Sequence, residues 1–275
     1  MAKQEISDPC APMSAEAVRA FVRQNDDFAF EMQVAAEIKD ILRVEVRHGA
    51  SYVDPVTLKP RQFDVRFRVE EDCKAVYYAV ECKNVAPAYP VIVCGRKADA
   101  NENFHDVIVS RGQLGTLHAS VKRAGATYFC AGEFVGKSIL KPGKGRDGEI
   151  YEGWSQALAS AHELVEEAVM IGAPLDKTSF GAVFPWLVVP NGALWCVDFD
   201  RSGHMNEPKL ATYCRYFVGH RVSNLLHVSE PICLSHVEIM TIGGMRELLG
   251  QLRNIRYDWD DWIPQKIRSA FVGGA

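Results

Sequence analysis

Hydrophobic and polar residues follow two different periods along the first third of the chain. Residues 28–43 repeat apolar positions every three to four residues, which predicts an amphipathic helix. Residues 62–70 alternate strictly, as in a strand with one buried face. Residues 75–83 are apolar at nearly every position until their end, which is typical of a strand covered on both faces. The apolar positions predicted to share one face of the alternating strand are Phe63, Val65, Phe67 and Val69.

The rest of the chain extends this order of elements. Ser14 is placed to cap a short helix over 15–23, and residues 44–47 (VEVR) indicate a short strand. The order through residue 131 is then helix, strand, strand, strand, helix, strand. The further predicted elements are a helix over 106–123, a strand over 126–131, a helix over 154–171, a hairpin of 183–189 and 193–200 around Pro190-Asn191-Gly192, strands near 212–218 and 232–240, and a helix near 245–254.

Composition narrows the class of protein. The chain has 275 residues, 48% of them hydrophobic, and a net charge of -4, so it is long enough to bury a core and is not generally basic. It has no apolar run long enough for a membrane span and no secretory signal, so we expect a soluble, cytoplasmic protein. Its eight cysteines are scattered without a CxxC pair, which disfavours a zinc ribbon or a redox dithiol.

Strand register brings two carboxylates together. In an antiparallel hairpin, paired residues have a constant index sum, and a turn between Asp72 and Cys73 sets that sum at 145. Asp64 and Glu81 also sum to 145, so their Cβ atoms should lie roughly 4.5–5.5 Å apart. Lys83 is two residues beyond Glu81 and therefore shares its face. Two carboxylates and one lysine thus converge by register alone.

Such a pair favours a bound cation, because like charges placed opposite each other repel. Oxygen ligands in a partly hydrated site suit Mg²⁺ or Mn²⁺. A neighbouring lysine such as Lys83 can orient or deprotonate a metal-bound water. This set of groups is suited to hydrolysis of a phosphodiester.

Glu31 falls on the apolar stripe of the helix over 28–43. Counting 100° per residue, it lies near the centre of that stripe. A carboxylate on a buried helix face needs a partner, which a metal ion or Lys83 would supply. The stripe consists of Val34, Ala35, Ile38, Ile41 and Leu42.

The stretch resembles the PD-(D/E)xK, or restriction-endonuclease-like, superfamily. The resemblance rests on Glu31 in the helix, on Gln62-Phe63-Asp64-Val65, and on Val80-Glu81-Cys82-Lys83-Asn84. It covers roughly residues 28–131 and includes the order of elements. The sequence departs from the family pattern at Phe63, where the family name specifies proline.

This resemblance implies an α/β fold: a restriction-endonuclease-like core of helix, three strands, helix and strand, with a mixed sheet, over 25–135. A tail and short helix (1–24) would precede it. Residues 150–275 would form an additional α+β region that either extends the sheet or makes an accessory domain. The implied site residues are Asp64 and Glu81 as metal ligands with the Cys82 backbone carbonyl, Lys83 to position the water, Glu31 as accessory carboxylate, and Gln113 as the glutamine that some members carry on the next helix.

The implied function is a Mg²⁺- or Mn²⁺-dependent endonuclease that acts on DNA. Arg and Lys are the usual phosphate contacts, and Arg61 and Arg66 are candidates for that role; a homodimer would suit double-strand cleavage. The cationic residues near the site in sequence are Lys59, Arg61, Arg66, Arg68, Arg96, Lys97 and Arg111.

Other interpretations stay open at this point. Asp64 could be an exposed carboxylate paired with Arg66 or Arg68, Glu81 and Lys83 a simple ion pair at a strand end, and Glu31 part of an interface salt bridge. At the level of the whole protein, a non-catalytic nucleic-acid-binding or assembly module with the same fold is the first alternative. A metal-dependent hydrolase of a small phosphate substrate is the second.

Overall fold

The computed structural model describes residues 12–71, 73–99, 102, 104–113, 116–124, 134–142, 148–171, 178–223, 225 and 227–255. This part of the chain has an α/β architecture with one large mixed sheet and four helices. No helix in these ranges is long and apolar enough to cross a membrane. The strand order in the large sheet is β1-β4-β5-β10-β14-β13-β9-β6-β11-β12, with the β7–β8 hairpin attached through β10.

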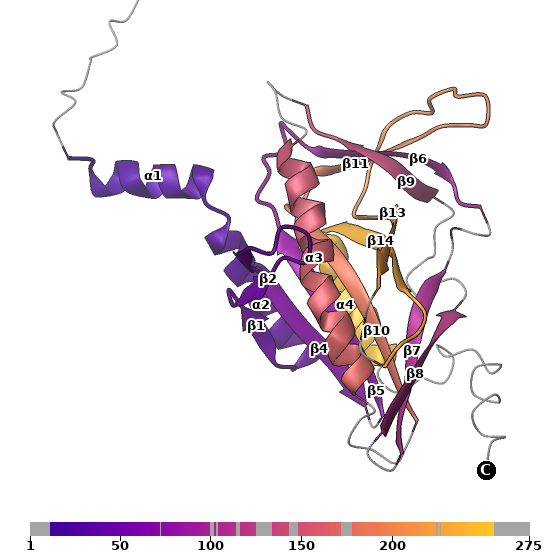
Figure 1. Cartoon of the computed structure of the whole chain (residues 1–275). Helices are drawn as coiled ribbons and strands as arrows, with labels where there is room; N and C mark the ends of the chain where they lie inside the picture. Colours follow the sequence, from indigo (N-terminus) through magenta and orange to yellow (C-terminus); the bar gives the residue numbers. More distant parts are fainter. Residues whose placement is uncertain are drawn as a thin grey trace, which may run out of the picture.

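The helices cover both faces of the sheet (Figure 1). Helices α2 (Phe28–Leu42) and α4 (Ile242–Ile255) pack on one face, and α3 (Gly148–Met170) packs on the other. Helix α1 (Ala15–Asn25) precedes them, and the Ser14 side chain accepts a hydrogen bond from the Ala17 N–H, which is the N-cap predicted from the sequence. All four predicted helices at these places are confirmed, with ends that differ by a few residues.

Three antiparallel strands form the first edge of the sheet: β1 (Val46–His48), β4 (Val65–Glu71) and β5 (Lys74–Cys82). Every pair between β4 and β5, from Val65 with Val80 to Glu71 with Lys74, has the predicted index sum of 145. The register on which the carboxylate prediction rests is therefore confirmed. A separate small hairpin, β2 (Ser51–Val53) and β3 (Pro60–Gln62), lies between β1 and β4 in the chain.

Phe63 does not share a face with Val65, so that prediction is wrong. The chain bends at Asp64 before β4 begins, and Phe63 packs instead with Tyr52 and with Ala159 of α3. The strict alternation of residues 62–70 extends through this bend, which is why sequence alone assigned a single strand.

The centre of the sheet is built from distant parts of the chain. Strand β10 (Ser179–Val189) pairs in parallel with β5 on one side and with β14 (Ile232–Thr241) on the other. Strand β13 (Tyr213–Val222) follows, antiparallel to β14. Residues 150–275 thus place strands directly beside the β4–β5 pair, in the same sheet. Trp186 of β10 and Tyr78 of β5 are fully buried in the core beneath α2 and α4.

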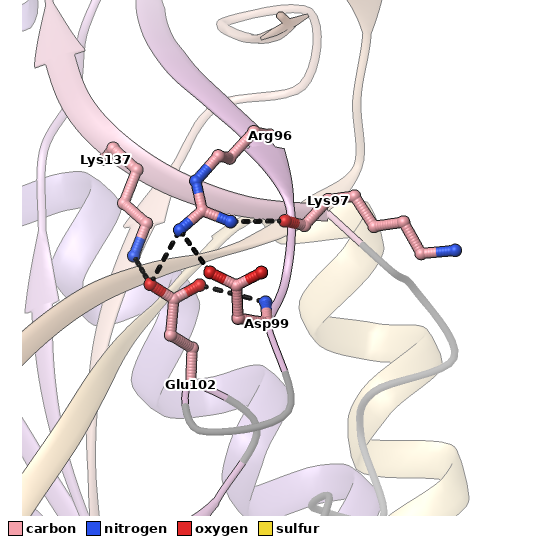
Figure 2. Close-up of polar contacts among 5 residues, drawn as sticks. All are labelled: Arg96, Lys97, Asp99, Glu102 and Lys137. Carbon is pink, nitrogen blue, oxygen red and sulfur yellow. Dashed lines mark hydrogen bonds and ion pairs between the residues drawn. The ribbon is translucent and has the colours of Figure 1, made fainter. Parts of the chain in front are cut away.

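The far end of the sheet contains β6 (Val91–Lys97), β9 (Phe134–Leu140), β11 (Leu194–Asp198) and β12 (Lys209–Leu210). Figure 2 shows the polar network that joins β6, β9 and the segment after β6. Glu102 accepts hydrogen bonds from Arg96 and Lys137, and Arg96 also pairs with Asp99 at 2.7 Å. This network ties the segment after β6 to two inner strands of the sheet, β6 and β9.

One predicted helix is a pair of strands in the structure. The helix predicted over 106–123 is a hairpin of β7 (His105–Gln113) and β8 (Thr116–Ala124), because Val107, Ile108 and Val109 are β-branched and are buried on both faces of a sheet. The strand predicted over 126–131 lies outside the described residues.

The predicted hairpin of 183–189 and 193–200 is also wrong. The turn exists, with Gly192 at a φ of +80°, but the two strands diverge after it. Strand β10 enters the buried centre between β5 and β14, whereas β11 pairs in parallel with β6. Both partners come from remote segments, which a local turn signal does not reveal.

Candidate active site

The predicted acidic residues and lysine meet at one end of the β4–β5 pair. Asp64 immediately precedes β4, Glu81 is the penultimate residue of β5, and Lys83 directly follows β5. Because the two strands are antiparallel, the start of β4 and the end of β5 lie at the same end of the strand pair. The N-terminal turns of α2 approach this end from one side of the sheet, and α3 approaches it from the other (Figure 1).

Asp64 is held by the backbone of the neighbouring strand. The Cys82 N–H donates to its Oδ2 atom at 2.7 Å. Burial raises the pKa of Asp64 to about 6; the Cys82 hydrogen bond opposes the rise, and the negative charge of Glu31 adds to it. The interpretation of Asp64 as an exposed partner of Arg66 or Arg68 is therefore wrong.

Glu81 is a deeply buried carboxylate, with an exposed fraction of 2%. Burial, followed by the nearby charge of Asp64, raises its pKa to about 8. Lys83 Nζ lies 2.9 Å from Glu81 Oε1. Burial lowers the pKa of Lys83, but the charge and hydrogen bond of Glu81 outweigh burial and raise that pKa above its usual value. Glu81 is thus a buried carboxylate whose ionisation Asp64 disfavours and Lys83 favours.

Glu31 is half-buried on α2, beside the stripe that packs on the sheet. Its Oε2 atom lies 3.0 Å from Nε2 of His48, the last residue of β1. Its partner within the protein is therefore this histidine rather than Lys83. The sequence identified His48 only as the end of a strand, and its closeness to Glu31 comes from the packing of α2 on β1. The buried residues of α2 are three of the stripe, Val34, Ile38 and Leu42, together with Phe30.

Asp27 is a further acidic residue of the site that sequence reasoning missed. It caps the N-terminus of α2, and its Oδ1 atom accepts a hydrogen bond from the Asn84 N–H at 2.9 Å. Its Oδ2 atom lies 3.6 Å from Lys83 Nζ. Asp27 therefore joins the start of α2 to the segment that carries Lys83. A run such as Asn25-Asp26-Asp27 is typical of a helix cap, but it does not indicate this contact.

Gln156 of α3 reaches the site from the opposite side. In the amide orientation that satisfies both neighbours, its nitrogen donates to Glu81 Oε1 and its oxygen accepts from Arg61 Nη1 at 3.3 Å. Arg61 also pairs with Asp54 at 2.8 Å and is partly exposed. Gln113, the glutamine predicted for a helix, ends strand β7 and has its backbone paired with Thr116; its side chain lies outside the described residues.

Arg66 connects β4 to α3. Its guanidinium donates to the Ser160 hydroxyl and carbonyl and pairs with Glu163 at 2.8 Å. The carbon of that group also lies 4.1 Å from the centre of the Phe63 ring. With an exposed fraction of 3%, Arg66 uses its charge within the fold, whereas Arg61 keeps part of its surface open at the site.

The site could hold a cation with two carboxylates. Among the described residues, no three His, Cys, Asp or Glu side chains form a ready metal cage. Mg²⁺ does not require one, since it commonly binds one or two carboxylates and keeps several waters. Asp64 and Glu81, whose pKa values are raised chiefly by burial and then by neighbouring negative charges, fit this requirement together with the Cys82 carbonyl.

Comparison with known proteins adds no family assignment. No protein-family model, curated protein or solved structure matches this chain.

Proposed function

We propose that the chain is a metal-dependent nuclease of the PD-(D/E)xK type that hydrolyses phosphodiester bonds in DNA with Mg²⁺ or Mn²⁺. The observation that carries the proposal is the buried Glu81 beside the half-buried Asp64, with Lys83 Nζ 2.9 Å from the Glu81 carboxylate. A purely structural ion pair would need only one of these carboxylates. The second leaves a surplus of negative charge, which a divalent cation would neutralise.

The arrangement of elements gives independent support. Helix α2, the antiparallel strands β1, β4 and β5, helix α3 and strand β10 occur in the order implied by the family resemblance, and β10 is parallel to β5. The resemblance places the second helix over 106–123, which is the β7–β8 hairpin, and the last strand over 126–131, so in this proposal α3 and β10 would take those two places instead. Strands β6 to β9 are inserted before α3.

The residues divide the chemistry between them. Asp64 and Glu81, with the Cys82 carbonyl, would hold the cation, which supplies a Lewis acid and an activated water. Lys83 donates to Glu81 and carries the positive charge closest to that carboxylate, so we assign it the orientation of the attacking water and of a phosphate oxygen. Gln156 holds Glu81 from α3 and is a positioning residue in this scheme.

Substrate contact is assigned to Arg61 rather than to Arg66. Arg61 donates to Gln156, which in turn donates to Glu81, and it is partly exposed, so its guanidinium can pair with a phosphate next to the scissile one. The buried guanidinium of Arg66 is bonded to α3. The net charge of -4 further implies that nucleic acid would bind through a local set of cations at the site.

A cleavage assay tests the proposal. Plasmid, linear duplex, branched DNA, single-stranded DNA and RNA would each be incubated with Mg²⁺, Mn²⁺ or EDTA. We expect metal-dependent cutting of DNA by the wild-type chain and by Asp40→Asn, an exposed carboxylate on α2, but not by Asp64→Ala or Lys83→Ala. Asp64→Ala cutting at the wild-type rate would refute the assignment.

The non-catalytic binding or assembly module predicts another result. It would bind nucleic acid without cutting any substrate and would show no Mg²⁺ or Mn²⁺ binding by calorimetry. A small-phosphate hydrolase would differ again, because its activity would lack the steep salt dependence that polyanion binding confers.

A further inference from the structure

The hairpin of β2 and β3 carries a buried tyrosine that the proposed chemistry does not use. Tyr52 of β2 has an exposed fraction of 3% and packs with Phe63 and with Ala159 of α3. Its phenol oxygen is buried and has no hydrogen-bond partner among the described residues. A buried hydroxyl left without a partner is costly, and such groups in native proteins commonly mark a functional residue or a place for water or an ion. The Tyr52 hydroxyl is therefore a donor free to bond a group of the site.

Tyr52 lies beside the candidate active site. It is paired across the hairpin with Arg61, and opposite residues of an antiparallel pair have their side chains on the same face. Arg61 donates to Gln156, which in turn donates to Glu81. Ala159, which packs with Tyr52, follows Gln156 by about one turn of α3. The hairpin thus brings a phenol and a guanidinium to the side of the sheet on which Glu81 faces α3.

The electrostatic surroundings of the phenol agree with this placement. Burial raises the pKa of Tyr52 to about 12, and among its charged neighbours Glu81 has the largest influence, ahead of Asp54 and Arg61. The phenol therefore keeps its proton throughout the physiological range. It can donate a hydrogen bond, but it is not suited to act as a general base.

Glu81 has an acceptor atom left for this donor. Its Oε1 atom contacts Lys83 and accepts from Gln156, whereas no described residue is bonded to its Oε2 atom. We propose that Tyr52 is a positioning residue whose hydroxyl donates to the Glu81 carboxylate when that carboxylate holds a cation. This hydrogen bond would orient the carboxylate and favour its charged form. Partners of this kind behind a metal ligand change metal affinity by roughly 10–100-fold. The inference rests on the proposed role of Glu81 as a metal ligand.

Tyr52→Phe removes the hydroxyl and keeps the ring, so it tests this role directly. Tyr77→Phe is the matched control, because Tyr77 is equally buried, lies on the same strand as Glu81 and accepts a hydrogen bond from Arg68. Calorimetric titration of the full chain with MgCl₂ should give a dissociation constant about tenfold higher for Tyr52→Phe and unchanged for Tyr77→Phe. In EDTA, the urea midpoint of Tyr52→Phe should be no lower than that of the wild-type chain, because the metal-free fold does not use this hydroxyl.

Cleavage of plasmid DNA at different Mg²⁺ concentrations gives a second measurement. Tyr52→Phe should cut about tenfold more slowly than the wild-type chain at limiting Mg²⁺ and at the wild-type rate when Mg²⁺ is saturating. A defect of the fold alone would not be rescued in this way. The Tyr77→Phe control should follow the wild-type curve.

The possible results separate this inference from the proposed function. Equal Mg²⁺ affinity of Tyr52→Phe and the wild-type chain would overturn the role of Tyr52 and leave the nuclease proposal standing. A urea midpoint in EDTA below that of the wild-type chain would also overturn it, because the hydroxyl would then stabilise the metal-free fold. A wild-type chain that binds no Mg²⁺ and cuts no substrate would overturn the proposed function and this inference with it.

Discussion

Replacing Glu81 by glutamine should make the metal-free protein more stable at neutral and alkaline pH. The pKa of Glu81 rises from 4.5 to about 8, chiefly through burial. One pKa unit corresponds to about 1.4 kcal/mol, so the ionised form carries a cost of about 5 kcal/mol. Glutamine keeps the shape without the charge. It also removes the ionic partner of Lys83, but the attraction of Lys83 is already included in the raised pKa, so the gain at pH 8 should be about 4 kcal/mol.

The pH dependence gives the sign of this effect. Because the folded-state pKa lies above the unfolded value, folding favours the protonated carboxyl, and the free energy of unfolding falls as pH rises from about 4.5 through about 8. The raised pKa of Asp64, about 6, adds a loss of the same sign at lower pH. Glu81→Gln should therefore match the wild-type chain near pH 4 and exceed it most at pH 8.

Urea unfolding followed by circular dichroism at pH 4, 6 and 8 in EDTA measures this difference. Asp40→Asn serves as the control, because it removes an exposed carboxylate from α2 and should change the free energy of unfolding little at any pH. Mg²⁺ should stabilise the wild-type chain and not Glu81→Gln. A variant that is less stable than the wild-type chain at pH 8, or a difference that does not vary with pH, would refute the reasoning.

Three further predictions concern other parts of the structure. Arg66→Ala should lower the free energy of unfolding by about 2–4 kcal/mol, because it removes a buried guanidinium that joins β4 to α3. Arg68→Ala, which removes an exposed ion pair with Glu70, should lower it by under about 1 kcal/mol. Thermal denaturation of the two variants measures this difference. Gly250→Ala should stabilise α4 by up to about 1 kcal/mol, because an added Cβ meets nothing within 4 Å. Gly244→Ala should destabilise α4, because its Cβ would lie 2.1 Å from a backbone oxygen. Equal shifts of the urea midpoint in the two variants would contradict these opposite effects. Gln156→Ala should reduce cleavage roughly tenfold, consistent with the loss of one positioning hydrogen bond, and raise the Mg²⁺ concentration required, and unchanged metal dependence would count against its role.

Local chemistry was enough to predict the features that depend on near neighbours. The N-cap at Ser14, the amphipathic stripe of α2 and the β4–β5 register all follow from spacing within one or two adjacent elements. The meeting of Asp64, Glu81 and Lys83 belongs to this group, because a short hairpin has a register set by its turn. The α/β class with a large mixed sheet was likewise predicted and is confirmed.

Tertiary structure decided the features that join distant segments. The hairpin at 105–124, predicted as a helix, is a strand pair in which the β-branched Val107, Ile108 and Val109 are buried and β7 pairs with the remote strand β10. Gln156 lies 75 positions from Glu81, and the sequence contains no signal that α3 rather than a nearer segment would cover it. Turn chemistry and hydrophobic periodicity act over a few residues, so they predicted the local elements and the β4–β5 register. Strand partners and buried contacts depend on which remote surfaces pack together, so they could be read only from the tertiary structure.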